Sequence, residues 1–342
     1  MRESVALYVA SQYNPRKENV RIIRMYDSDP ALFSGFQFVQ SIGEADYVLI
    51  PQRLSKMTPE WRSYFDTQKQ MARREGKQII LFIGTDLGHT MHVPDTLVFK
   101  GSAYKSALQE NEAVHAIYAE DLSTGKGIRP RKKKDRPLVS FCGYAGFPTL
   151  ESKLKYHVKN AALNVGAFVT RDDNLKARKR GIFFRRNAMK FLSNHSAIDT
   201  NFIVRDRFTS GAVMQDSRRV REEYIASIEE ADYVLTPKGD GNASMRFYEV
   251  LSLGRIPLLI DTDMSMPFET TLDYTDFSLR VSHGDLARIG DIVGEFHASL
   301  SADRFEHMQS MARKAYVEFL RFDSYFNRAF PLLREKGMGA LR

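Results

Sequence analysis

A glycine-rich turn, followed by a helix with an arginine and a glutamate, is the part of this chain best suited to chemistry. An apolar run ends at Pro237, and the turn Lys-Gly-Asp-Gly-Asn follows. Asn and Ser are favoured helix N-caps, and the free N–H groups and dipole of a helix N-terminus bind anions. The residues that we expect to contact a bound diphosphate and its attached groups are Gly239, Asp240, Asn242, Ser244, Arg246, Glu249 and Arg207.

Arg246 and Glu249 are three residues apart and therefore share one face of the predicted helix. An arginine pairs with phosphate oxygens through a bidentate fork, and a carboxylate can accept two ribose hydroxyls. The pair therefore fits a nucleoside diphosphate. The alternative is an ion pair within the helix, which would contribute only ~0.3–0.5 kcal/mol.

A second loop offers a general base. Asp86 and His89 lie between glycines in residues 84–91, directly after the apolar run 78–84. An imidazole with an ordinary pKa of ~6.5 suits this work, and a carboxylate can also accept the proton. Either residue is a candidate catalytic base. The alternative is that Asp86 caps a turn and that His89 is merely exposed.

Short β-rich runs alternate with helical stretches, a pattern that predicts an α/β fold. Thr58 and Pro59 have the residue types of an N-cap and a first helical position, so a helix is expected at Pro59–Arg74. The other strands are expected at residues 5–10, 46–51, 78–84, 137–143, 201–206, 232–237 and 256–261, and the other helices at 149–163, 217–228, 243–253 and through most of 285–333.

An internal repeat predicts two related domains. Residues 41–51 (SIGEADYVLIP) and 227–237 (SIEEADYVLTP) agree at nine of eleven positions. We therefore expect two Rossmann-like domains that face a central cleft. The predicted segments are an acceptor domain (1–124), a basic linker (125–137), a donor domain (138–300), and C-terminal helices that pack across the domains (301–342). The linker is expected to be solvated rather than a phosphate or nucleic-acid contact.

Four short motifs resemble the signature of the exostosin family of glycosyltransferases. They are a Pro-x-Gly-Asp turn, a Ser-x-Arg-x-x-Glu helix, a Gly-x-Ile-Pro segment and a Pro-Phe pair, at residues 237–240, 244–249, 254–257 and 267–268. Residues 273–278 resemble the continuation of the signature, and the resemblance extends over about 139–281. Arg255 replaces a cysteine of many members, at a position that we expect to be an inconsequential turn.

The resemblance implies a GT-B fold and glycosyl transfer from a nucleoside-diphosphate sugar, commonly UDP-linked, to a glycan acceptor. It also implies inversion at the anomeric carbon and neither cofactor nor essential metal. Asp261-Thr262-Asp263 has the letters of a metal motif, but it follows a strand that should lead into residues 267–268. The expected acceptor is a cell-surface polysaccharide or its precursor. The alternative function is a non-catalytic nucleotide-sugar-binding or scaffold subunit of a glycosyltransferase complex.

Composition limits the kinds of structural site and binding partner that the chain can have. The chain has 342 residues, a net charge of +8 and one cysteine, Cys142, so an internal disulfide framework and a cysteine-rich zinc site are excluded. No apolar run suits a signal peptide or a membrane span, and we expect a cytoplasmic protein whose basic clusters make a peripheral contact with anionic membrane. Nucleic acid is not an expected partner, because no aromatic–basic interleaving, helix-turn-helix or zinc motif is present.

Overall fold

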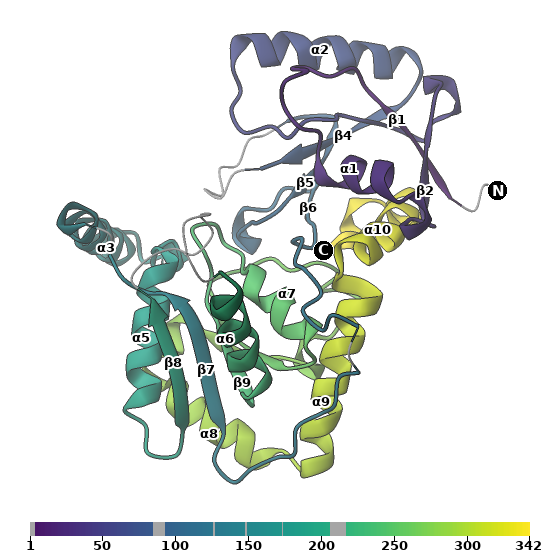
Figure 1. Ribbon diagram of the computed structural model, residues 1–342. Coiled ribbons are helices and arrows are strands. Elements are labelled where there is room, and N and C mark those ends of the chain that lie inside the picture. Colours follow the sequence, from purple (N-terminus) through teal and green to yellow (C-terminus); the bar gives the residue numbers. More distant parts are fainter. Residues whose placement is uncertain (1–3, 85–92, 126, 148, 173, 206–216) are drawn as a thin grey trace. The chain divides into compact units, whose positions relative to one another are not determined.

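The chain folds into two compact units in a computed structural model that describes residues 4–84, 93–125, 127–147, 149–172, 174–205 and 217–342 (Figure 1). Unit 1 comprises Met1–Tyr118, Met264–Asp273 and Glu318–Arg342, and unit 2 comprises Ala119–Asp263 and Tyr274–Val317. Each unit is built on its own parallel sheet.

Unit 1 has a six-stranded parallel sheet in the order β2-β1-β3-β4-β5-β6. Its strands and helices are β1 (Val5–Val9), α1 (Arg21–Ser28), β2 (Phe36–Val39), β3 (Tyr47–Leu49), α2 (Pro59–Arg74), β4 (Gln78–Ile83), β5 (Thr96–Lys100), β6 (Glu112–Val114) and α10 (Phe322–Lys336). Alternate residues of β4 point to opposite faces of the sheet. Leu81 joins the core under α2, whereas the ring of Phe82 packs against Phe326 of α10. The sheet is therefore covered on both faces, which explains why its central strands β1, β3 and β4 are mostly apolar.

Unit 2 has a five-stranded parallel sheet in the order β11-β10-β9-β7-β8. Its elements are β7 (Leu138–Tyr144), α3 (Leu150–Thr170), α4 (Asn174–Ala177), α5 (Gly181–Ser193), β8 (Asp199–Arg205), α6 (Ser217–Glu229), β9 (Tyr233–Thr236), α7 (Met245–Ser252), β10 (Ile256–Asp261), β11 (Leu279–Ser282), α8 (Ile289–Ser299) and α9 (Ala302–Ala315). Phe184 of α5 and Val293 of α8 pack in one core cluster with the strands, and Ile228 of α6 and Val250 of α7 pack in another. A π-helical turn, Tyr316–Leu320, follows α9.

The repeat has the same place in both sheets. In each, the first strand of the unit lies between the second and the third, and the repeated segment leads into the third, which is β3 or β9. Asp46 Oδ2 accepts a hydrogen bond from the backbone N–H of Ala6 in β1 at 2.8 Å. Asp232 Oδ2 accepts the corresponding bond from Leu138 in β7 at 2.9 Å. The α/β class, the two Rossmann-like parallel sheets and the helical C-terminal region are thus confirmed.

The observed units cross the boundaries that we predicted at 124/125, 137/138 and 300/301. Unit 1 ends its first segment at Tyr118 and takes up Met264–Asp273 and Glu318–Arg342, so α9 belongs to unit 2 and α10 to unit 1. The predicted linker, residues 125–137, lies wholly within unit 2. Sequence patterns missed this division because local composition marks a turn but does not show which sheet the turn packs on.

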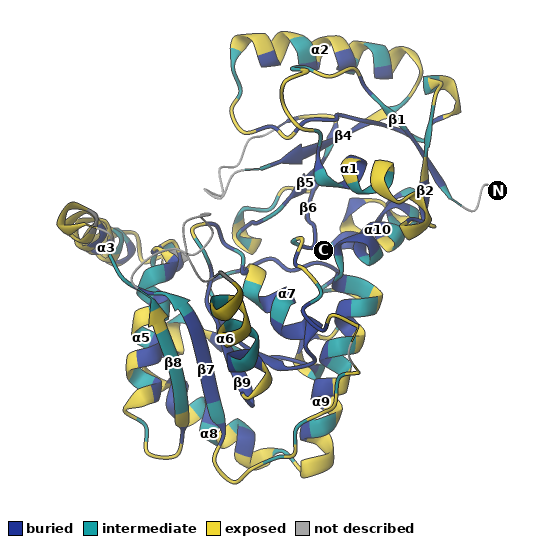
Figure 2. Cartoon of the chain, in the orientation of Figure 1, coloured by how far each residue is buried: buried dark blue, intermediate teal, exposed yellow. Residues whose placement is uncertain are grey.

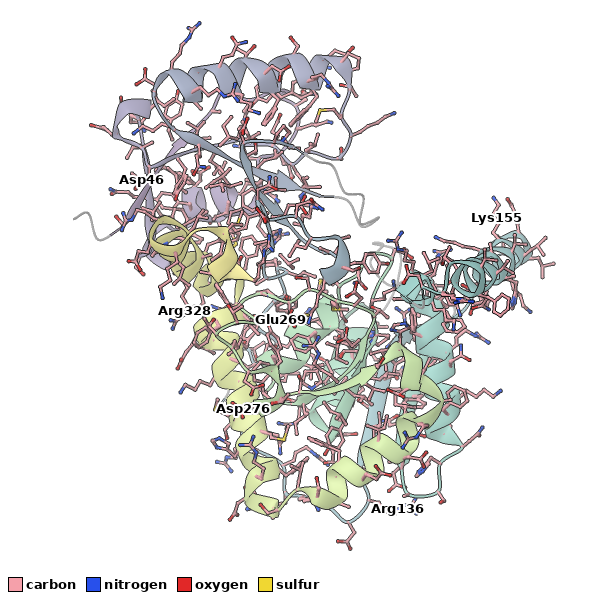
Figure 3. The ribbon with its side chains drawn as sticks, turned by 180° about the vertical axis from the view of Figure 1, so that it is seen from behind. Asp46, Arg136, Lys155, Glu269, Asp276 and Arg328 are labelled. Carbon is pink, nitrogen blue, oxygen red and sulfur yellow. The ribbon has the colours of Figure 1, made fainter. Side chains whose placement is uncertain are left out.

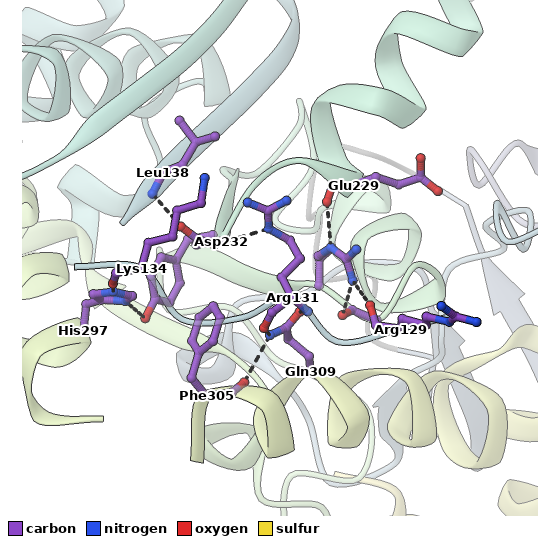
Figure 4. Close-up of polar contacts among 12 residues, drawn as sticks. Arg129, Arg131, Lys134, Leu138, Glu229, Asp232, His297, Phe305 and Gln309 are labelled. Atoms are coloured by element: carbon purple, nitrogen blue, oxygen red, sulfur yellow. Dashed lines mark hydrogen bonds and ion pairs between the residues drawn. The ribbon is translucent and has the colours of Figure 1, made fainter. Parts of the chain in front are cut away.

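The basic segment is held on unit 2 by side chains and backbone rather than being a free solvated linker (Figure 4). Arg131 pairs with Asp232 at 3.3 Å, and its backbone exchanges two hydrogen bonds with the Gln309 amide. The His297 ring bonds the Lys134 carbonyl at 2.7 Å. These contacts fasten both ends of the RKKK run to the unit.

Arg255 is the second departure from expectation. Its side chain is buried, and it donates to the carbonyl oxygens of Glu229 and Arg129 at 3.0 and 3.4 Å. The same guanidinium also bonds the Leu253 and Gly254 carbonyls. Arg255 therefore ties the turn after α7 to the basic segment, so the exchange of cysteine for arginine is structural and not inconsequential.

Burial follows the layers of each unit, with strands dark and the outer helix faces light (Figure 2). Across the described part of the chain, none of the helices combines the length and the apolar character that crossing a bilayer requires. α3 is nevertheless unusual, because apolar side chains make up much of its exposed surface.

Candidate functional site

The predicted site residues lie at the point of unit 2 where the strand order reverses. From β7 the chain moves to β8 on one side and then to β9 on the other. Ligands of open parallel sheets bind outside the carboxyl ends of the strands at such a switch point. The segments that leave this edge are the one after Tyr144 and the turn that begins at Pro237.

Arg246 lies in the first turn of α7 and reaches across to β7. Its Nη2 donates to the Cys142 carbonyl at 2.9 Å, and its guanidinium carbon lies 4.3 Å from the centroid of the Phe141 ring. Gly143 has a φ of +153°, and a Cβ there would lie 2.7 Å from Arg246 Nη2. The close approach of the guanidinium therefore requires glycine at this position.

Arg185, in α5, meets the same strand end. Its Nη1 donates to the Tyr144 carbonyl, and its guanidinium lies 5.5 Å from the Phe141 ring. Burial and, secondly, the positive charge of Arg246 lower the pKa of Arg185 to about 10. Two guanidinium groups thus converge at the end of β7 although their charges repel.

The Nε atoms of Arg185 and Arg246 are both buried, and neither has a hydrogen-bond partner among the described residues. An unsatisfied buried donor costs about 1–3 kcal/mol, and more when the group is charged. An anion with several acceptor oxygens would satisfy both groups and offset their repulsion. Arg185 was not among the residues predicted for the site; its one signal in the sequence is the adjacent pair Arg185–Arg186.

The turn after β9 is built from internal contacts. The Gly239 N–H donates to the Ala243 carbonyl at 2.9 Å, which closes the turn. The exposed Asp240 carboxylate pairs with Arg180 at 3.2 Å. A Cβ on Gly181, the first residue of α5, would lie 2.1 Å from the Lys238 carbonyl oxygen. The amino ends of α5 and α7 therefore both adjoin this turn, and their dipoles favour negative charge there.

Asn242 and Ser244 shape the end of the turn. The buried Asn242 amide donates to the Thr262 and Asp263 carbonyls at 3.1 Å each and accepts from the Thr262 hydroxyl at 2.6 Å. Asn242 thus braces the turn against the segment after β10 rather than presenting its amide to a ligand. Ser244 is the N-cap of α7, as predicted, but makes no side-chain cap hydrogen bond.

Lys238 places a buried amine beside the turn. Its Nζ donates to the Ala177 carbonyl at 2.7 Å. Burial, together with the nearby charge of Lys159, lowers its pKa to about 7. The residue was not predicted to belong to the site, because a single lysine in a turn has no distinguishing pattern.

Glu249 lies one turn after Arg246 on the same face of α7 and is half-buried. The Tyr224 hydroxyl donates to its carboxylate, and burial raises the pKa of Tyr224. Arg246 also lies over the Tyr224 ring, at 5.9 Å from its centroid. Both α7 residues are described, and no ion pair joins them, so the alternative of an intrahelical pair does not account for their positions.

The remaining predicted residues divide into two groups. Asp86, His89 and Arg207 lie outside the described residues. Asp261, of the Asp-Thr-Asp sequence, accepts a hydrogen bond from Arg280 at 2.8 Å. Where the structure describes the chain, it brings together no group of three or more His, Cys, Asp or Glu side chains suited to a metal ion.

A histidine that the sequence did not indicate lies at the corresponding edge of unit 1. His115 follows β6 directly, and its buried ring bonds the Ala116 carbonyl through Nδ1 at 2.8 Å. Burial lowers its pKa to about 4, so the imidazole is neutral at pH 7.

The fold and the site together define a two-unit α/β protein in which two buried arginine side chains meet at the switch point of the second sheet. The family comparison gives a more specific result: residues 167–296 match the exostosin GT47 domain. This match includes Arg185, Arg246 and Glu249.

Curated relatives match over short stretches. An exostosin-1 homolog from Caenorhabditis elegans is 28% identical over 116 residues, which cover 32% of this chain and 29% of the relative. A probable glucuronoxylan glucuronosyltransferase, IRX7, from Arabidopsis thaliana is 33% identical over 70 residues, 20% of this chain and 16% of the relative. The chain thus spans less than a third of the length of these relatives.

Solved structures are similar at a coarser level. A glycosyltransferase from Rickettsia africae covers 98% of this chain and 99% of its own at 10% identity, with a TM-score of 0.39. A mutant of S. aureus TarM, in complex with fondaparinux, alpha-GlcNAc-glycerol and UDP, covers 84% of this chain and 55% of its own at 8% identity and a TM-score of 0.38.

Proposed function

We propose that this protein is an inverting glycosyltransferase that moves a sugar from a nucleoside-diphosphate sugar, UDP-linked, to a glycan acceptor without an essential metal. The observation that carries the proposal is the pair of guanidinium groups, Arg185 and Arg246, whose buried Nε donors lack partners among the described residues at the switch point. A diphosphate supplies the acceptors and the negative charge that this pair needs. The match of residues 167–296 to the exostosin GT47 domain supports the same reaction class.

In the proposed complex, Arg185 and Arg246 bind the diphosphate, and Glu249 accepts hydroxyls of the ribose. Negative charge grows on the leaving diphosphate as the bond to the anomeric carbon breaks. The fixed cations and the two helix N-termini stabilise that charge, which is the work that a metal ion would otherwise do. No cofactor takes part.

The acceptor half of the reaction requires a base. The acceptor hydroxyl gives its proton to Asp86 or His89, and its oxygen attacks the anomeric carbon from the face opposite the diphosphate. Either of the two residues can be the base in this proposal. A cell-surface polysaccharide or its precursor is the proposed acceptor, which is consistent with the polysaccharide-directed name of the Arabidopsis relative.

A nucleotide panel tests the donor site. UDP should raise the melting temperature of the wild-type protein by mass action, with or without EDTA. Arg246→Ala and Glu249→Ala should abolish this shift. Arg218→Ala is the matched control, because Arg218 is in the same unit with a side chain that is 91% exposed and pairs only with Glu222 among the described residues. A UDP shift that survives Arg246→Ala would reject the site.

Turnover is tested separately from binding. Release of UDP from UDP-sugars, in the presence of oligosaccharide acceptors, should persist in EDTA. Asp86→Ala or His89→Ala should stop it while leaving the UDP-induced shift unchanged. Loss of transfer in EDTA would contradict the metal-free mechanism, and binding with no transfer to any acceptor would favour the scaffold alternative.

A further inference from the structure

Helix α3 exposes an apolar stripe that the proposed function does not use. The side chains of Leu154 and Phe168 are 65% and 85% exposed. The full stripe consists of Leu150, Leu154, Val158, Val165, Phe168 and Val169. With 3.6 residues per turn, these positions run along one face over the whole 21-residue helix. Scattered exposed apolar residues are ordinary, but a continuous stripe of this kind marks an interaction surface.

The opposite face of α3 fastens the helix to unit 2. Tyr156, Asn160 and Ala167 are buried. The Tyr156 ring packs on Phe147 at 4.9 Å between centroids, and α3 also contacts α4. In Figure 1, α3 projects from the side of unit 2 where α5 and β8 lie. The stripe is therefore turned outward by the way the helix is packed.

Lysines border the stripe on both sides. Lys153 lies along one edge, and Lys155 and Lys159 lie along the other, all of them exposed. Figure 3 labels Lys155 on this projecting helix. The helix contains three lysines and one acidic residue, Glu151, which pairs with Lys155. A helix with an apolar face and lysines beside it has the composition of an interfacial membrane helix.

Several other basic residues of unit 2 have partners within the unit. Arg131 pairs with Asp232, Lys132 with Glu306, and Arg180 with Asp240. Arg185 points to the end of β7. Among these basic residues only those of α3 adjoin a continuous exposed apolar stripe.

We infer that α3 lies in the plane of an anionic lipid surface, with its apolar stripe in the acyl boundary and its lysines on the headgroups. Charge complementarity selects this occupant over a second copy of the chain. Two α3 helices paired through their stripes would set their lysine rows beside each other, with one glutamate per helix to offset them. An anionic bilayer satisfies both the stripe and the lysines.

Vesicle sedimentation tests the inference with the full chain. We expect binding to vesicles of equal parts phosphatidylcholine and phosphatidylglycerol, and at least about tenfold weaker binding to phosphatidylcholine alone. The double change Leu154→Glu and Phe168→Glu should weaken binding to the mixed vesicles by about tenfold or more. Leu32→Glu, at an exposed leucine of unit 1, is the control and should bind as the wild type does.

The lysines are tested in the same assay. Lys153→Gln with Lys155→Gln should weaken binding to the mixed vesicles only, whereas Lys336→Gln, at an exposed lysine of α10, should have no effect. All of these variants should keep the UDP-induced thermal shift, which separates this inference from the proposed function. Equal vesicle binding by the wild type and the Leu154/Phe168 variant would overturn the inference. The absence of vesicle binding by the wild type would also overturn it. A wild-type dimer that the Leu154/Phe168 variant dissociates, without vesicle binding, would assign the stripe to a second copy of the chain instead.

Discussion

Replacing Arg185 by methionine should leave the stability of the ligand-free protein nearly unchanged while weakening donor binding. The pKa of Arg185 is lowered from 12.5 to about 10, which corresponds to roughly 3 kcal/mol against the charged form in the folded state. Methionine fills a similar volume beside Phe141 and removes this penalty. It also removes the hydrogen bond that the charged guanidinium donates to Tyr144, worth about 1.5–3 kcal/mol, and the contact with the Phe141 ring, worth about 1 kcal/mol. These losses nearly offset the gain, so the free energy of unfolding should change by about 1 kcal/mol or less.

The same substitution removes a charged donor from the diphosphate. A hydrogen bond to a charged group contributes about 1.5–3 kcal/mol, so the dissociation constant of UDP should rise roughly 10- to 150-fold. Urea unfolding without ligand and isothermal titration with UDP measure the two effects. Arg218→Met, at the exposed arginine of α6, should change neither quantity. A loss of stability together with unchanged UDP affinity would show that Arg185 is a structural arginine and would refute the reasoning.

Three further predictions follow from single contacts. Gly143→Ala should lower the free energy of unfolding by about 1–3 kcal/mol and weaken UDP binding, because the new Cβ would displace the Arg246 guanidinium. Urea unfolding and isothermal titration measure the two effects, and unchanged UDP affinity would contradict this placement of the guanidinium. Lys238 has a pKa of about 7 in the folded protein against 10.5 when unfolded, so between these pH values the unfolded state holds one more proton than the folded state. The free energy of unfolding should therefore rise with pH by up to ~1.4 kcal/mol per pH unit, relative to Lys238→Met. A difference between the two proteins that does not change with pH would contradict the burial of the amine. Arg255→Ala should cost about 2–4 kcal/mol in urea unfolding, because it leaves several carbonyl groups without their donor, and a cost near zero would return Arg255 to the inconsequential role first expected.

The sequence was sufficient where local rules act alone. The α2 helix begins and ends as predicted, because Thr58 accepts the Trp61 N–H as an N-cap and Pro59 fits the first helical position. The repeated segments predicted two related sheets, because each combines a buried apolar strand with the aspartate that fastens it to the first strand. Fold class therefore followed from patterns within single elements.

Other elements have no such local pattern. The β5 and β6 strands were not predicted, because each contains a charged residue where a buried strand is expected to be apolar. The structure shows that these two residues, Lys100 and Glu112, form a buried ion pair at 2.6 Å. The α3 helix extends to Thr170, beyond the predicted end at 163. The prediction ended too early because the exposed face of α3 is also apolar, so the last turns lack the alternation of apolar and polar residues that marks a surface helix.

The candidate site shows the same division. Arg246 could be predicted because it follows a glycine turn on the helix that the turn starts. Arg185 precedes it by about sixty residues and joins it only because α5 and α7 both meet the switch point between β7 and β9, a juxtaposition that no local pattern encodes. Asn242 was expected to touch the ligand, but tertiary contacts with Thr262 give it a bracing role.

A crystal structure of the protein with UDP is the most direct test that the switch point of unit 2 is the donor site. The account predicts that phosphate oxygens lie within hydrogen-bonding distance of Nε of both Arg185 and Arg246, and that the ribose hydroxyls meet the Glu249 carboxylate. A diphosphate bound elsewhere, with both Nε atoms still lacking partners, would contradict it.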